Sequence, residues 1–191
     1  ILPKLKNIKH NVPFLKKEFI SLTDIINTRK WILLTSVFSM LFVLQISAQT
    51  IENIDNFMND GSGESLYLKN LITELHSSAY IEDGVVTTYG NGSPVILNTG
   101  TKEFSFLYNE NLAFGETELI KLVIDKPEDL QNKFDITRLQ GFNNLAWIYV
   151  SFSFNPCSGD SDDCLLSRVQ NLFQGLDQSS VKVVYKLSIP N

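Results

Sequence analysis

The clearest pattern of apolar and polar positions lies in the C-terminal half of the chain. Residues alternate with a period of two in Ala146–Phe154 and again in Val181–Ile189, and Glu118–Asp125 is a mostly apolar run. These features are typical of strands. Pro127 suits the first turn of a short helix, and Asp162–Gly175 carries apolar residues at helical spacing, with the glycine placed as its stop. The order strand, helix, strand, helix, strand predicts a parallel β-α-β-α-β unit.

The preceding part of the chain changes from helical spacing to short strand-like segments. Thr50–Asn59 and Glu64–Ser77 carry apolar residues at helical spacing, which predicts two N-terminal helices. Val85–Tyr89, Val95–Leu97 and Lys102–Tyr108 are short, with turn residues between the first two, and they predict a small antiparallel meander. The predicted fold class is therefore α+β.

One spacing in the C-terminal half resembles a turn of a leucine-rich repeat. Apolar residues recur at Leu139, Phe142, Leu145 and Ile148, and the segment from Leu119 to Ile124 repeats the end of this pattern twenty-six residues earlier. Such residues would point into a stacked core. The asparagine that the repeat expects after its strand is missing, and ordinary packing of strands and helices accounts for the same residues.

A long uncharged segment precedes this domain. Trp31–Ile51 contains no charged residue, follows Arg29 and Lys30, and includes small residues near its end. A positive flank, an apolar core and a small-residue exit predict a bacterial signal segment with cleavage after Ala48 or Gln49. An uncleaved membrane anchor is the alternative, because about 20 apolar residues can span a bilayer.

These features divide the chain into two parts. Residues 1–49 form the leader and signal segment, of which 1–28 is longer than a signal requires and is consistent with a gene start placed too far upstream. Residues 50–191 form a single exported α+β domain. The apolar run does not end in a cysteine, which argues against a lipidated N-terminus.

Charge is distributed unevenly between the two parts. Residues 1–49 hold seven of the sixteen lysines and arginines, whereas nineteen of the twenty-one acidic residues lie in 50–191. An acidic domain repels nucleic acid phosphates, and no basic run offsets that repulsion. Nucleic acid binding is therefore set aside.

The two cysteines frame a polar acidic loop in the exported part. Cys157 and Cys164 predict a disulfide, because exported proteins reach an oxidising compartment. Asp160, Asp162 and Asp163 resemble part of a calcium loop, although the glycine and the final glutamate of that loop are absent. The alternative is a solvated acidic loop that begins a helix, since acids suit the positive end of a helix dipole.

Few residues support catalysis. His76 is the only histidine of the exported part, and it follows a predicted helix, where its ring can satisfy helix carbonyls. No nucleotide-binding motif is present, and no cofactor is predicted. Trp147 and Tyr149 share one face of a predicted strand and are candidates for a ligand-contacting face, unless a helix covers them.

The sequence thus predicts a small exported bacterial domain, periplasmic or extracellular, that acts by binding a protein, a glycan or an envelope component. Membrane contact is expected only through an uncleaved signal segment. One alternative is a hydrolase of envelope material that uses carboxylates or His76. The other is an envelope structural protein anchored through its N-terminal apolar helix.

Overall fold

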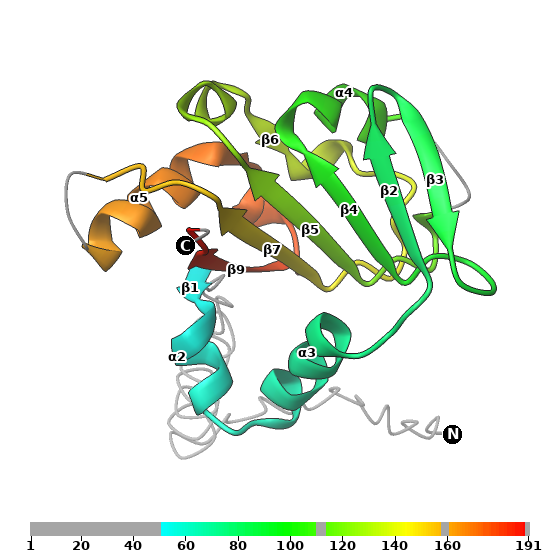
Figure 1. Ribbon diagram of the computed structural model, residues 1–191, viewed down its shortest axis with the longest axis horizontal. Helices are drawn as coiled ribbons and strands as arrows, with labels where there is room; N and C mark the ends of the chain where they lie inside the picture. The colour runs from blue at the N-terminus through cyan, green and yellow to red at the C-terminus, as the bar shows by residue number, and fades with distance from the viewer. Residues whose placement is uncertain (1–50, 110–113, 158–160, 190–191) are drawn as a thin grey trace, which may run out of the picture. The chain divides into compact units, whose positions relative to one another are not determined.

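A single large β-sheet organises the domain. The computed structural model describes residues 51–109, 114–157 and 161–189. Within them, seven strands lie in the order β1-β9-β7-β5-β4-β2-β3. These strands are β1 (Ile51–Asn53), β2 (Ser78–Glu82), β3 (Val85–Tyr89), β4 (Ile96–Gly100), β5 (Leu119–Ile124), β7 (Trp147–Phe152) and β9 (Lys182–Leu187). All neighbours are parallel except β2 and β3, and Figure 1 shows β3 pointing against β2, β4 and β5.

Short helices and turns connect the strands. The α-helices are α2 (Ile54–Asn59), α3 (Gly63–Thr73), α4 (Phe104–Leu107) and α5 (Asp162–Leu172). Single 3₁₀ turns are η1 (Thr101–Glu103), η3 (Pro127–Gln131), η4 (Ile136–Arg138) and η5 (Leu176–Gln178), and a small second sheet pairs β6 (Phe134–Asp135) with β8 (Phe173–Gln174). Helices together with a mixed sheet confirm the predicted α+β class.

The order of the strands explains which elements cover which face. From β2 through β4, β5 and β7 to β9, each step moves one place in the same direction across the sheet. Crossovers between parallel strands are right-handed, so these connections lie on one face. The larger core cluster includes Phe104 of α4, Phe134 of β6 and Val169 of α5, all on that face. The step from β1 to β2 runs the opposite way.

The opposite step places α2 and α3 on the other face of the sheet. Their buried residues Ile54, Phe57, Leu68 and Leu71 pack against one residue near the start of each of β4, β5 and β7 and against Val184 of β9. Figure 1 shows α3 beside the ends at which β4 and β5 begin, and α2 directly after β1. We call the part of this face that α2 and α3 leave uncovered the open face; it carries Lys121, Asn98, Tyr80 and Thr87.

The predicted meander is replaced by one hairpin. β2, which the sequence analysis did not predict, pairs antiparallel with β3, while β4 pairs parallel with β2. Lys102–Tyr108 forms η1 and α4 instead of a strand. Phe104 and Leu107 are three residues apart and are both buried, so the helical spacing outweighs the alternation of aromatic residues.

The C-terminal strands match the prediction closely. β5, β7 and β9 are adjacent and parallel. The register pairs Leu122 with Val150, whereas the repeat-like spacing aligns Leu122 with Ile148. α5 ends at Leu172, three residues before the predicted stop at Gly175, and the two residues of β8 lie between them. Ordinary packing of strands and helices accounts for the repeat-like residues in this part of the chain.

The predicted signal segment, its cleavage position at Ala48 or Gln49 and the leader 1–28 lie outside the described residues. Among the helices that the structure does describe, none is long and apolar enough to cross a membrane.

Candidate functional site

The two residues predicted to contact a ligand have different surroundings. Trp147 is only 4% exposed, because α2 covers it and the Phe57 ring lies edge-on with 5.2 Å between ring centroids. Tyr149, two residues further along β7, is half-buried. The strand face is thus covered at Trp147, and its accessible part begins closer to the carboxyl ends of the strands.

A row of polar side chains crosses this face. The strand register places Tyr149 beside Lys121, Lys121 beside Asn98, and Asn98 beside Tyr80. Thr87 of β3 completes the row opposite Tyr80. Because neighbouring strands lie about 4.8 Å apart, the row spans roughly 19 Å.

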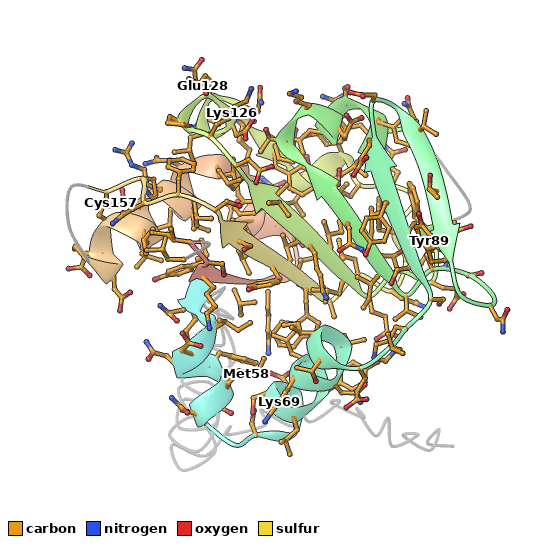
Figure 2. The ribbon with its side chains drawn as sticks, viewed as in Figure 1. Met58, Lys69, Tyr89, Lys126, Glu128 and Cys157 are labelled. Atoms are coloured by element: carbon orange, nitrogen blue, oxygen red, sulfur yellow. A yellow bond between two sulfur atoms is a disulfide. The ribbon has the colours of Figure 1, made fainter. Side chains whose placement is uncertain are left out.

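Two tyrosines dominate the outer end of this row. Tyr80 of β2 and Tyr89 of β3 are 42% and 60% exposed, and their rings meet edge to face with centroids 5.5 Å apart. Together with Leu75, His76 and Val85 they line a hollow of about 700 Å³, which we call the tyrosine hollow. Tyr89 is labelled on the hairpin in Figure 2. Exposed aromatic side chains grouped in this way are typical of interaction sites.

A second concavity adjoins the hollow where β2, β4 and β5 end. We call it the strand-end groove; its volume is about 620 Å³. It shares Tyr80, Glu82 and Asp83 with the tyrosine hollow. Lys126 lies on its far side, and Figure 2 shows Lys126 and Glu128 beyond the carboxyl end of β5. Ligands of open parallel sheets commonly bind outside the carboxyl ends of the strands.

Buried Asp129 holds one wall of the strand-end groove. Its carboxylate accepts hydrogen bonds from the Thr101 hydroxyl at 3.1 Å and from the backbone N–H groups of Asp125 and Lys126 at 3.1 and 3.2 Å. Three donors satisfy the charge that burial would otherwise leave unpaired. Asn132 adds a hydrogen bond to the same threonine hydroxyl at 3.0 Å.

The other groove carboxylates include two with structural partners. Glu103 accepts hydrogen bonds from the N–H groups of Asp83 and Gly84, which fixes the turn of the β2–β3 hairpin. Asp125 accepts one from the Ser153 hydroxyl at 2.8 Å. Glu82 and Asp83 are exposed. Within the described residues, Glu103, Asp125 and Asp129 therefore brace loops, and no carboxylate of this groove forms a hydrogen bond with His76.

Lys121 is the positive group of the polar row. It is half-buried, and burial lowers the pKa of its ammonium group. Its Nζ donates to the carbonyl oxygen of Ile72, near the end of α3, at 3.4 Å. No carboxylate of the described residues forms an ion pair with it, in contrast to Lys182, which pairs with Glu64, and Lys186, which pairs with Asp55.

His76 lies just beyond the end of α3. Its Nε2 is 3.1 Å from the carbonyl oxygen of Asn70, so the ring can donate to a helix carbonyl. This is the structural role that the sequence allowed, although the residue also borders the tyrosine hollow. A Ser-His-Asp arrangement is not formed around it by the residues that the structure describes.

The cysteine loop contains the predicted disulfide. Cys157 and Cys164 are bonded, with 6.2 Å between their Cα atoms, which removes both thiols as nucleophiles. Of the calcium candidates, Asp160 lies outside the described residues. Asp162 and Asp163 occupy the first turn of α5, and Asp162 accepts a hydrogen bond from the Asn53 side chain at 3.2 Å. No cluster of three metal-ligating side chains occurs in the described ranges.

Comparison of the chain with protein-family models, with curated proteins and with solved structures finds no match. The candidate site therefore depends on the geometry alone. The sequence analysis did not predict that Tyr80 and Tyr89 lie side by side, because it did not predict β2. The signal was present, since Asp83-Gly84 separates two short strand-like segments by a two-residue turn.

Proposed function

We propose that this protein is an exported, non-catalytic binding domain, and that its tyrosine hollow binds a glycan of the cell envelope. The observation that carries the proposal is the exposed pair Tyr80 and Tyr89, set at the end of a polar row on an otherwise packed sheet. No catalytic role is assigned to any residue.

The chemistry of the hollow suits a sugar chain. A tyrosine ring offers a flat apolar surface for the C–H face of a pyranose, and its hydroxyl can hydrogen-bond at the rim. Asn98, Thr87 and Glu82 supply an amide, a hydroxyl and a carboxylate close to the rings. Binding sites typically combine an apolar surface with a few polar groups that fix orientation.

Hydrolysis is less well supported than binding. A glycoside hydrolase needs two carboxyl groups on either side of the scissile bond. Asp129 is enclosed by three donors, and Glu103 is held by two backbone N–H groups. Release of reducing sugar from a bound polysaccharide would contradict the non-catalytic assignment and favour the hydrolase alternative.

Export is proposed from the apolar segment Trp31–Ile51, and the Cys157–Cys164 disulfide agrees with an oxidising destination. Mass spectrometry of the N-terminus after expression in a bacterial host tests this. A start at Gln49 or Thr50 is expected. Retention of the segment in the membrane fraction would favour the anchored structural protein instead.

The glycan proposal is tested by titrating the isotopically labelled protein with soluble peptidoglycan fragments and neutral oligosaccharides, followed by NMR. Chemical-shift changes centred on β2 and β3 are expected. Tyr80→Ala and Tyr89→Ala should each weaken binding at least about fivefold, since a buried aromatic contact contributes roughly 1–3 kcal/mol.

Tyr67→Ala is the matched control. Tyr67 is a similarly exposed tyrosine, but it lies on α3 and its hydroxyl contacts Glu118. Its substitution should leave glycan affinity unchanged. Equal losses in all three variants, or shift changes away from the hairpin, would overturn the proposed site.

A further inference from the structure

The two edges of the main sheet differ in how well they are protected. β1 ends one side; it has only three residues, and its middle residue is the charged Glu52. β3 ends the other side, and no strand of the described residues pairs with its outer edge. Native proteins usually blunt such an edge with charges, proline, bulges or short length, because its free backbone groups invite pairing.

β3 has none of these protective features. Its five residues, Val85–Tyr89, contain no charge and no proline, and all five pair in register with β2 without a bulge. Val85 is 63% exposed at one end of the strand and Tyr89 is exposed at the other. The strand is thus neutral in a domain in which acidic residues strongly outnumber basic ones.

The hairpin geometry identifies the backbone groups that face outward. Asp83 and Gly84 both have positive φ angles, 51° and 74°, as a two-residue type I′ turn requires. In such a hairpin the closing pair, Glu82 and Val85, exchanges both hydrogen bonds, and the pattern alternates along the ladder. Val86 and Thr88 therefore direct their N–H and C=O groups away from β2.

We propose that β3 pairs with β3 of a second copy of this chain, antiparallel and with Thr87 on the two-fold axis. Each Val86 then faces the partner's Thr88 in a hydrogen-bonded pair, and the two Thr87 residues form the non-hydrogen-bonded pair between them. About four backbone hydrogen bonds close the interface. The seven-stranded sheets of the two copies become continuous across it.

The side chains of β3 are complementary to themselves in this register. Thr87 meets its own copy, and a cross-strand threonine pair is favourable. Val85 meets the partner's Tyr89 at both ends, which is an aromatic pair with a β-branched residue. These contacts lie on the open face, where both residues are exposed in the single chain.

Electrostatic repulsion does not prevent the pairing. The nearest acids, Glu82 and Asp83, lie at the hairpin turn, and antiparallel pairing sends the two turns to opposite ends of the interface. Five residues of strand separate them by roughly 17 Å. This distance is about twice the Debye length of roughly 8 Å at physiological salt, so their repulsion is largely screened.

The register can be tested by disulfide trapping in the exported protein. Non-hydrogen-bonded pairs have Cα atoms about 4.5 Å apart, within the range of a disulfide. Under mild oxidation, Thr87→Cys should give a covalent dimer on a non-reducing gel. Thr88→Cys is the matched control, because two residues at position 88 are diagonal neighbours roughly 7–8 Å apart.

A second test measures association without a cross-link. Sedimentation velocity over a range of concentrations should show a dimer that dissociates on dilution, since one strand pair buries less area than a permanent interface. Thr87→Lys places like charges opposite each other on the axis and should weaken dimerisation at least about tenfold. Ser105→Lys, an exposed site on α4, should not.

The proposal is overturned if the protein stays monomeric at every concentration, or if Thr87→Cys and Thr88→Cys form covalent dimers equally well. Glycan binding is a separate outcome: a dimer without glycan binding would remove only the proposed function. Glycan binding by a wild-type protein that stays monomeric at every concentration would remove only this inference.

Discussion

Among single residues, Asp129 connects three segments that line the strand-end groove. It is 7% exposed, and its two carboxylate oxygens connect η1, the end of β5 and η3 through three hydrogen bonds. Because Asp129 is the buried residue of η3, its hydrogen bonds do much to hold this turn in position.

Replacing Asp129 with alanine should lower the free energy of unfolding by about 2 kcal/mol or more, because three donors lose a charged acceptor in a buried site. Chemical denaturation with urea measures the change. Glu128→Ala is the control, since Glu128 is the exposed neighbour on the same turn and should change stability by less than about 0.5 kcal/mol. Equal effects would mean that the Asp129 hydrogen bonds are not stabilising.

Lys121 predicts a specific pH dependence. Burial lowers the pKa of Lys121 in the folded protein below its ordinary value of 10.5. Between the lowered pKa and 10.5 the unfolded chain binds more protons, so this residue makes stability rise with pH in that window and costs stability below it. Lys121→Met removes this cost.

We expect Lys121→Met to be more stable than wild type near pH 7, and the difference should shrink as the pH approaches 10.5. Urea denaturation of both proteins at several pH values measures this. Taking the difference cancels the contribution of the tyrosines that titrate in the same range. A difference that does not vary with pH would contradict the proposed cause.

At the residue scale the sequence predicted those features that depend on local chemistry. The bonding of Cys157 to Cys164 follows from two thiols bounding a short loop, and the contact of His76 with a helix carbonyl follows from its place after a helix. The burial of Trp147 depends on α2, whose position over β7 is a long-range contact. No local pattern specifies that.

Elements were predictable where burial imposes a clear period. β5 and β7 are buried on one face along their whole length and β9 along most of it, which explains the apolar run of β5 and the alternation in β7 and β9. β2 is a single short strand whose companion β3 is exposed, and the hairpin carries little apolar pattern. α4 is one turn long, which is too short for helical periodicity to separate from alternation.

The turn between β8 and η5 depends on a glycine, Gly175. Gly175 has φ +72°, in the left-handed region, and a Cβ atom there would lie 2.3 Å from Cγ2 of Thr137. Thr137 cannot simply rotate away, because its hydroxyl donates to the Asp135 carboxylate at 2.6 Å.

Gly175→Ala should therefore destabilise the protein by about 2 kcal/mol, of which roughly 1 kcal/mol is the backbone cost for an L-residue and the rest is the steric clash. In a Thr137→Ser background the methyl group is absent, and the cost should fall to about 1 kcal/mol. A double-mutant cycle measured by thermal unfolding checks the coupling. Additive effects would show that the two residues do not clash.

At the scale of the whole molecule, one edge of the main sheet is formed by two strands from opposite ends of the domain, β1 and β9. Ile51 of β1 pairs with Val183 of β9, and β9 lies between β1 and β7. This order was not readable from the sequence, because the pairing of β1 depends on a strand far away in the chain. The sequence analysis assigned Ile51 to a helix for the same reason.

Removing residues 50–52 from a chain that begins at Thr50 should lower its unfolding free energy by about 1–2 kcal/mol, through loss of strand hydrogen bonds and of the partly buried Ile51. Asn53 is kept, since its side chain caps α2 by accepting from the Asp55 N–H at 2.9 Å. Hydrogen exchange should speed most in β9. Unchanged exchange there would mean that β1 adds no protection.

The place of β9 in the sheet also sets the order of events during biosynthesis. β1 has no neighbour until residue 183 has been made, and β7 lacks one of its two neighbours until the same moment. The nascent chain therefore cannot complete its sheet before β9 has been synthesised. Under the proposed export, a chain that still lacks β9 has an incomplete sheet, and an incompletely folded chain is the state that can be threaded through a protein-conducting channel.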